Sequence, residues 1–108
     1  MRVQITARHC EIPDSVRERA HELAEKLPRF DTRVSGVELV FDEERRTRKV
    51  EGIVSRDRTS PIVAHGESPE WPGAVDAMFD RLTRQLRRQR AQAVDHQATP
   101  TAGDLLED

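Results

Sequence analysis

The sequence lacks most of the residues from which disulfide-rich, aromatic-rich or membrane-spanning domains are built. It has one cysteine, no tyrosine and 4% aromatic residues in a length of 108. An internal disulfide framework is therefore excluded, and a reducing cytoplasm is the expected compartment. No apolar run approaches the roughly 20 residues of a membrane helix, so no membrane partner is expected. Leu, Ile, Val and Phe number only 24, which predicts one small domain with a thin core.

Charge is abundant and unevenly distributed along the chain. Charged residues make up 35% of the sequence, yet the net charge is only -2. Residues 81–93 carry five arginines and no acid, and a second basic cluster lies at residues 45–49. Residues 94–108 carry four acids and neither lysine nor arginine. We therefore expect a domain over residues 1–93 that would bind a polyanion through one face, followed by a flexible acidic tail or linker over residues 94–108.

Hydrophobic periodicity predicts six elements. Apolar residues alternate in four segments, which predicts strands over residues 2–8, 34–42, 48–56 and 62–67. Helical spacing predicts an amphipathic helix over residues 14–27, with a capping box at Ser15–Glu18 and an end at Pro28, and a longer helix over residues 73–93. Short turns favour antiparallel pairing, except where the first helix crosses over to a parallel neighbour. The predicted fold class is α+β, a two-layer β-α-β-β-β-α domain with a four-stranded sheet and both helices on one face.

The longer helix has two chemically distinct faces. At about 100° per residue, an apolar stripe spans about 60° to 160° from Arg81, and arginines occupy the remaining arc. The stripe comprises Val75, Met78, Phe79, Leu82 and Leu86, and the opposite face carries Arg81, Arg84, Arg87, Arg88 and Arg90. Arginine suits bidentate contact with phosphates, but such a face can also be a solvated one that complements the helix dipole. From the residues alone, both interpretations stay open.

Motifs that carry catalysis or hold a metal are missing from the sequence. It has no glycine-rich phosphate loop, no nucleophile elbow and no paired CxxC motif. The segment His21–Glu25 is faintly similar to a zinc-protease helix, but Glu25 stands where a second histidine is needed. His9 and Cys10 have no second pair at ligand spacing. We therefore expect a protein that is not an enzyme, with no metal, no cofactor and no small-molecule substrate.

Several short motifs occur in an order that is characteristic of one protein family. They are Met1–His9, Val16–Glu18, Lys26–Leu27 with Phe30 and Arg33, and Ala74–Asp76 followed by Asp80–Leu86. Over about residues 1–90 the chain thereby resembles the ribosome hibernation-promoting factors, also called ribosome-associated inhibitor or sigma-54 modulation proteins. The resemblance implies a dsRBD-like domain that lodges between the head and body of the small ribosomal subunit. Such a factor would bind rRNA over the mRNA and the A- and P-site tRNA positions, and would inhibit translation in stationary phase or stress.

The resemblance also implies which residues bind RNA, because structured RNA is read by shape and by phosphate contacts. The first group is the arginine face of the longer helix, namely Arg81, Arg84, Arg87, Arg88 and Arg90. The second group is Lys26, Arg29, Arg33, Arg45, Arg46, Arg48 and Lys49. Long members of the family carry a further dimerisation domain, so this chain would be a short form or the N-terminal domain of a long form, monomeric in isolation. The alternative is a protein-interaction module that regulates a transcription factor without contacting RNA.

Overall fold

The computed structural model of the chain describes residues 1–98, and their side chains as far as Gln89. The elements in this part of the chain follow the predicted order of strand, helix, three strands and helix. They are β1 (Arg2–Arg8), α1 (Asp14–Glu25), the 3-10 turn η1 (Leu27–Arg29), β2 (Val34–Glu44), β3 (Thr47–Arg56), β4 (Thr59–Ser68) and α2 (Trp71–Ala98).

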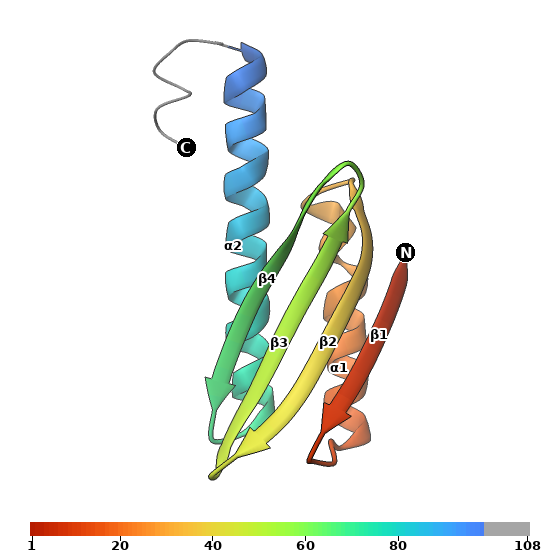
Figure 1. Cartoon of the computed structure of the whole chain (residues 1–108), viewed down its shortest axis with the longest axis vertical. Coiled ribbons are helices and arrows are strands. Elements are labelled where there is room, and N and C mark those ends of the chain that lie inside the picture. The colour runs from red at the N-terminus through yellow and green to blue at the C-terminus, as the bar shows by residue number, and fades with distance from the viewer. Residues whose placement is uncertain (99–108) are drawn as a thin grey trace.

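The four strands form one sheet in the order β1-β2-β3-β4, and both helices lie on the same face of it (Figure 1). β1 pairs parallel with β2, because α1 carries the chain across the sheet between them. β2, β3 and β4 pair antiparallel through short turns. The predicted two-layer α+β arrangement is therefore confirmed.

The core lies between the sheet and the helices. The predicted apolar stripe of α2 is buried along its whole length, with Leu82 and Leu86 fully inaccessible to solvent. The stripe packs in one cluster with the inward-facing residues of the strands, among them Leu39, Phe41 and Val54. Trp71 fixes the start of α2, because its buried ring meets Phe41 edge to face with 5.5 Å between the ring centroids. This packing confirms the predicted rotation of α2, whose opposite face is turned to solvent.

The beginning and end of α1 differ from the prediction. The capping box is wrong, since no side chain caps the helix. The carbonyl of Pro13 instead accepts the backbone N–H groups of Val16 and Arg17, at 3.0 and 3.1 Å. At the other end the helix stops at Glu25, because the chain tightens into the 3-10 turn that contains Pro28. The proline ends the α-helix as expected, but from inside a turn of its own.

The hairpin between β2 and β3 is longer than predicted, and only Arg45 and Arg46 form its turn. Opposite charges face each other just before the turn, with Glu43 3.7 Å from Arg48 and Glu44 3.1 Å from Lys49. Such cross-strand pairs extend the ladder through a segment that its charge marked as a loop. Both turn residues have positive φ angles, 50° and 70°, in the left-handed region that non-glycine residues rarely adopt.

The helix α2 is also longer than predicted, because it begins at Trp71 and continues to Ala98. Residues 94–98, where the sequence predicts a flexible tail, are therefore helical. The rest of the predicted tail, residues 99–108, lies outside the described residues.

Two glycines allow α2 to lie directly against the sheet. A Cβ atom on Gly66 of β4 would meet the carbonyl oxygen of Ala74 and the amide nitrogen of Met78, which are backbone atoms of the helix. A Cβ atom on Gly52 of β3 would lie 2.5 Å from the sulfur of Met78. At Gly66 the atoms in the way are helix backbone, so glycine is required there for the close approach that holds the first turns of α2 on the sheet and so positions the turns that follow.

Candidate nucleic-acid interface

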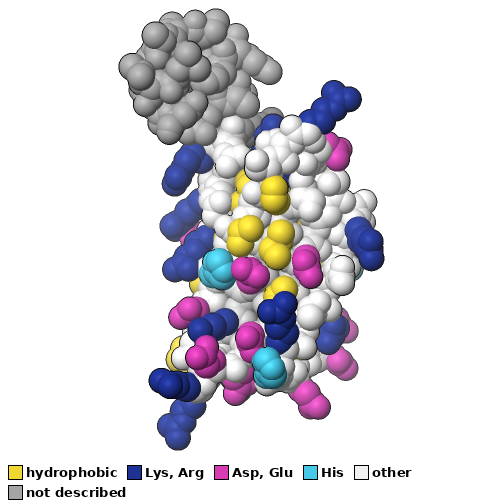
Figure 2. Space-filling model, in the orientation of Figure 1, with side chains coloured by type: hydrophobic (Ala, Val, Ile, Leu, Met, Phe, Trp, Pro, Cys, Tyr) yellow, Lys and Arg dark blue, Asp and Glu magenta, His cyan; other side chains and the backbone are white. Residues whose placement is uncertain are grey.

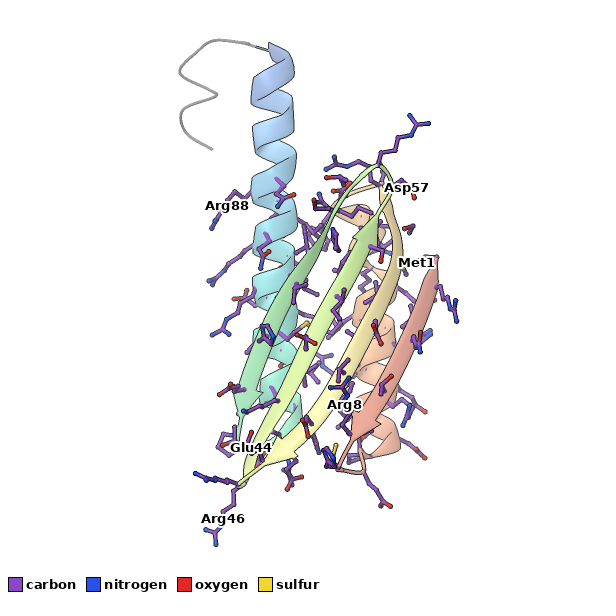
Figure 3. The ribbon with its side chains drawn as sticks, viewed as in Figure 1. Met1, Arg8, Glu44, Arg46, Asp57 and Arg88 are labelled. Carbon is purple, nitrogen blue, oxygen red and sulfur yellow. The ribbon has the colours of Figure 1, made fainter. Side chains whose placement is uncertain are left out.

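The solvent-facing side of α2 presents an arginine fan, which we define as Arg81, Arg84, Arg87 and Arg88. All four side chains are exposed, and basic side chains gather along the α2 flank of the molecule (Figure 2). The four arginines lie outside the buried stripe of the helix, and Arg88 points outward from α2 (Figure 3). Arg90 lies in the same helix, but its side chain is outside the described part of the structure.

Three arginines of the fan have different neighbours. Arg81 donates through Nη1 to the carbonyl oxygen of His65 at 2.6 Å. Arg87 lies over the ring of Phe30, with its guanidinium carbon 5.0 Å from the ring centroid. Arg84 pairs with Asp80 at 2.9 Å, although its side chain is 70% exposed. Among the described residues, this is the one carboxylate within 4.0 Å of the fan, so most of its positive charge is available to an external anion.

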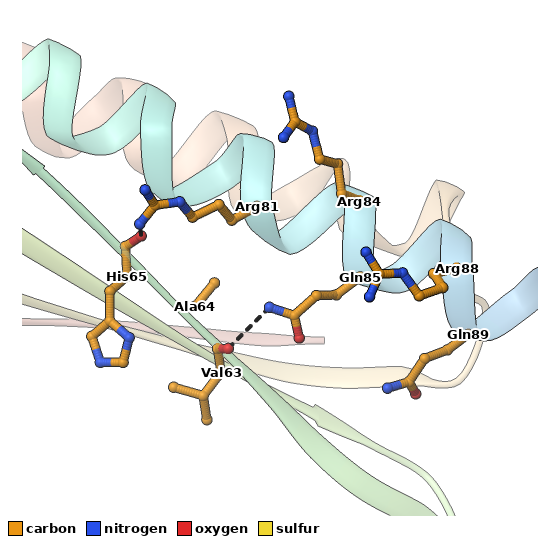
Figure 4. Close-up of a pocket in the computed structure, with 8 residues that line it drawn as sticks. All are labelled: Val63, Ala64, His65, Arg81, Arg84, Gln85, Arg88 and Gln89. Carbon is orange, nitrogen blue, oxygen red and sulfur yellow. Dashed lines mark hydrogen bonds between the residues drawn. The ribbon is translucent and has the colours of Figure 1, made fainter. Parts of the chain in front are cut away.

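A groove lies beside the fan, between β4 and α2 (Figure 4). It has a volume of about 660 Å³ and is lined by Val63, Ala64, His65, Arg81, Arg84, Gln85, Arg88 and Gln89. Gln85 spans it by donating from Nε2 to the carbonyl oxygen of Val63 at 3.2 Å. Sequence reasoning missed this groove and its glutamines, because it exists only where the helix and the strand meet.

The mid-chain basic cluster divides into exposed and engaged residues. Arg45 and Arg46 extend from the tip of the β2–β3 hairpin, at the far end of the molecule from Arg88 (Figure 3). Arg48 donates to the carbonyl oxygen of Pro69 at 3.1 Å and lies over the ring of Trp71 at 5.6 Å. Lys49 bonds to Glu44, and this carboxylate raises the pKa of the lysine. The structure therefore does not unite this cluster with the arginine fan.

The remaining predicted residues, Lys26, Arg29 and Arg33, lie in or beside η1. Lys26 and Arg29 are exposed, and the contact between Phe30 and Arg87 brings this segment alongside the fan. Arg33 is different, because it donates to both carboxylate oxygens of Asp31 at 3.0 and 2.9 Å. The guanidinium of Arg33, which the sequence predicts to contact RNA, therefore already donates hydrogen bonds within the protein.

Asp31 is the centre of a second arginine cluster that the sequence did not reveal. Its side chain is 5% exposed and also accepts a hydrogen bond from Arg56, which is 2% exposed. The hydrogen bond from Arg33 is the main reason why the pKa of Asp31 falls from 3.8 to about 2. Arg56 further donates to the carbonyl oxygen of Ser60 at 2.8 Å, tying β3 to the start of β4. The one sequence signal for its burial is its inward-facing register with Val50 and Val54.

Other kinds of site find little support in the described part of the chain. Among the side chains that the structure describes, no three of His, Cys, Asp or Glu lie together in a way that could hold a metal ion. The helices there also include none long and apolar enough to cross a membrane. Cys10 is half-buried with its thiol 3.5 Å from the carbonyl oxygen of Phe41, and burial raises its pKa. An unreactive structural thiol is the chemistry that this environment favours.

Comparisons with known proteins point to a single protein family. A family model described as sigma 54 modulation protein / S30EA ribosomal protein matches residues 3–93. A relative from Azotobacter vinelandii named ribosome hibernation promoting factor is 25% identical over 97 residues, which cover 90% of each chain.

Solved structures share the fold. A ribosomal subunit interface protein from Coxiella burnetii matches with a TM-score of 0.77 at 22% identity, over 84% of this chain and 99% of that chain. The N-terminal domain of Protein Y from Thermus thermophilus matches with a TM-score of 0.71 at 21% identity, over 82% of this chain and 98% of that chain. At these identities the match establishes the architecture of the sheet and helices.

Proposed function

Because the chain belongs to the sigma 54 modulation protein / S30EA ribosomal protein family, we propose that it is a hibernation factor of the small ribosomal subunit. It associates with ribosomes and is not an enzyme. In the proposed complex it lies in the cytoplasm, in the channel between the head and body of the small subunit. There it excludes mRNA and the A- and P-site tRNAs, and so inhibits translation in stationary phase or stress.

The exposed arginine fan is the observation that carries this proposal. Three of its four guanidinium groups have no carboxylate partner among the described residues. The fan sits on a helix that is anchored along its whole buried stripe, so its geometry is preorganised for a rigid polyanion. Guanidinium groups pair bidentately with phosphates, and structured RNA offers phosphates in a fixed array. A rigid arginine surface of this kind favours rRNA over a hydrophobic protein partner.

Charge reversal of the fan tests the proposal. We expect the triple variant Arg84→Glu, Arg87→Glu, Arg88→Glu to lose co-sedimentation with small subunits, while its circular dichroism stays that of the parent. A matched control reverses Arg2, Arg8 and Arg17, which are also exposed but lie on β1 and α1, and it should bind normally. If the fan variant still sediments with small subunits, the RNA-binding proposal is wrong and the protein-interaction module takes its place.

Salt dependence provides a second test that needs no variant. If about five phosphates are neutralised, the logarithm of the association constant should fall with the logarithm of salt concentration with a slope of about -3 to -5. A hydrophobic interface would show a much flatter dependence. Sucrose gradients of extracts from growing and stationary cells, probed for this protein, then test when the complex forms. Equal amounts on ribosomes in both states would contradict the stationary-phase part of the proposal.

A further inference from the structure

Side chains of α2 form hydrogen bonds to the outer edge of β4. β4 ends the sheet, so alternate residues direct their backbone groups away from β3. Gln85 donates to the outward carbonyl oxygen of Val63, and Arg81 donates to that of His65 (Figure 4). Two residues before Val63 stands Pro61, which has no N–H group to offer. The edge is therefore closed to a further strand, because an added peptide needs those carbonyl oxygens as acceptors.

What remains in the groove is a set of hydrogen-bond donors. In an extended strand the N–H and C=O groups of one residue point the same way, so the N–H groups of Val63 and His65 also face the helix side. Arg84 and Arg88 are one helical turn apart and line the same groove, which places two guanidinium groups on one side of it. Asp80 pairs with Arg84 at 2.9 Å, but Arg88 has no carboxylate within 4.0 Å among the described residues, so the net positive charge of the groove favours an anion over a peptide.

The two glutamines add a different chemistry at the same place. Gln85 uses its Nε2 for the bond to Val63, which leaves its Oε1 as an acceptor. Gln89 lines the groove one turn further along α2 and makes no hydrogen bond to another described residue. A side-chain amide can donate and accept at once, and so can pair with the edge of a nucleobase. The exposed side chain of Val63, at 42%, offers an apolar surface beside them.

We propose that the groove between β4 and α2 binds one unpaired nucleotide of the RNA. Arg84 and Arg88 hold its phosphate, and Gln85 and Gln89 contact the edge of its base. The volume of about 660 Å³ lies within the range of small-ligand sites. A duplex keeps its bases stacked inside, whereas loops and bulges splay single bases outward into such recesses. This inference rests on the proposed RNA-binding function and adds a preference for single-stranded RNA at one point of that surface.

Nucleotide titrations of the full chain, followed by ¹⁵N–¹H NMR, test the inference with defined probes. Each of the four nucleoside 5′-monophosphates should shift the backbone amides of Val63 and His65 and the side-chain amides of Gln85 and Gln89. Ribose 5-phosphate carries the phosphate without a base, so it should leave the glutamine side chains unshifted. If it shifts them as the nucleotides do, or if the nucleotides shift none of these groups, the proposed base contact is wrong.

A matched pair of variants extends the test to RNA. Gln89→Leu removes the amide without changing charge, and we expect affinity for a short single-stranded RNA to fall about two- to tenfold, as for one lost hydrogen bond. Gln4→Leu makes the same change on β1, away from the groove, and should have no effect. Unchanged affinity of Gln89→Leu would overturn the inference. The proposed function stands or falls separately, by the fan variant's sedimentation with small subunits.

Discussion

The arginines around Asp31 and the arginines of α2 differ in what neutralises their charge. Arg33 and Arg56 converge on one buried carboxylate, which lies 2.9 and 3.4 Å from them. In the arginine fan, Arg84 has a carboxylate partner, and that partner, Asp80, is 56% exposed. The charges of the first set are therefore neutralised inside the protein, whereas most of the charge of the second stays exposed to solvent.

The contrast shows that residue type and local spacing do not determine the role of an arginine. Around Asp31 the charges join the segment between η1 and β2 to the end of β3, 25 positions further along the sequence, and through Arg56 to the start of β4. On α2, the arginine side chains extend from a helix that packs against the sheet without using them. Substitutions in the first set should consequently alter stability, and those in the second should alter binding.

The largest expected effect on stability comes from Asp31→Ala. Removing this carboxylate leaves the buried guanidinium of Arg56 without its ionic partner, which costs about 3–5 kcal/mol of unfolding free energy. Urea unfolding of the variant and its parent measures this loss. The control is Asp76→Ala, since Asp76 pairs with Arg19 at 3.4 Å but both side chains are more than half exposed. It should unfold as the parent does, and equal losses in the two variants would contradict the contrast.

Substitutions on the buried and exposed sides of α2 should differ in their effect on the free energy of unfolding. Leu82 is fully buried, so Leu82→Ala should lower the free energy of unfolding by about 2–5 kcal/mol through lost burial and a cavity. Arg84→Ala, two residues on and exposed, should leave the denaturation curve in place. A Leu82→Ala variant with an unaltered curve would mean that the helix is rotated differently from the packing described.

The pH dependence of stability should reveal the contribution of the buried carboxylate of Asp31. Because Arg33 and Arg56 lower the pKa of Asp31 to about 2, the ionised form is the one that the folded state favours. Its stabilising contribution is complete above the ordinary pKa of 3.8 and is lost as pH falls through about 2. The difference in melting temperature between the parent and Asp31→Asn should therefore shrink steadily from pH 5 to pH 2. A constant difference over that range would show that the charge of Asp31 contributes nothing.

The smallest expected effect concerns the hairpin tip. Arg45 and Arg46 both adopt positive φ, whereas Asn-Gly is the sequence that such two-residue turns prefer. The double substitution Arg45→Asn, Arg46→Gly should raise the free energy of unfolding by about 1 kcal/mol. If these arginines contact RNA as the sequence predicts, the same variant should bind small subunits more weakly. Higher stability with unchanged binding would confine RNA contact to the α2 side of the molecule.

The order and type of the elements could be predicted because alternation and helical spacing report directly on burial. The ends of the elements could not, because they depend on tertiary partners. β2 and β3 extend to the turn through Glu43 and Arg48, which meet only after the hairpin forms. The start of α1 depends on the carbonyl of Pro13 rather than on the side chain of Ser15.

The candidate site was predictable in part, for the same physical reason. The arginine face of α2 follows from helix geometry, since one buried stripe determines which residues point outward. The engagement of Arg33 by Asp31 required knowledge of how the chain turns after η1. The groove beside Gln85 required the distance between a helix and a strand edge, which no local pattern contains.

Because α2 packs so closely on Gly66, a small tilt of the helix at this contact would produce a larger displacement at its far end. The contact lies at Ala74 and Met78. Arg88 leaves the helix about 15–20 Å further along the axis, at 1.5 Å per residue. A methyl group at position 66 would have to lift the helix off the strand, and a tilt of about 10° over such an arm displaces its far end by about 3 Å. A glycine in the sheet thus determines where the arginine side chains of the proposed binding surface lie.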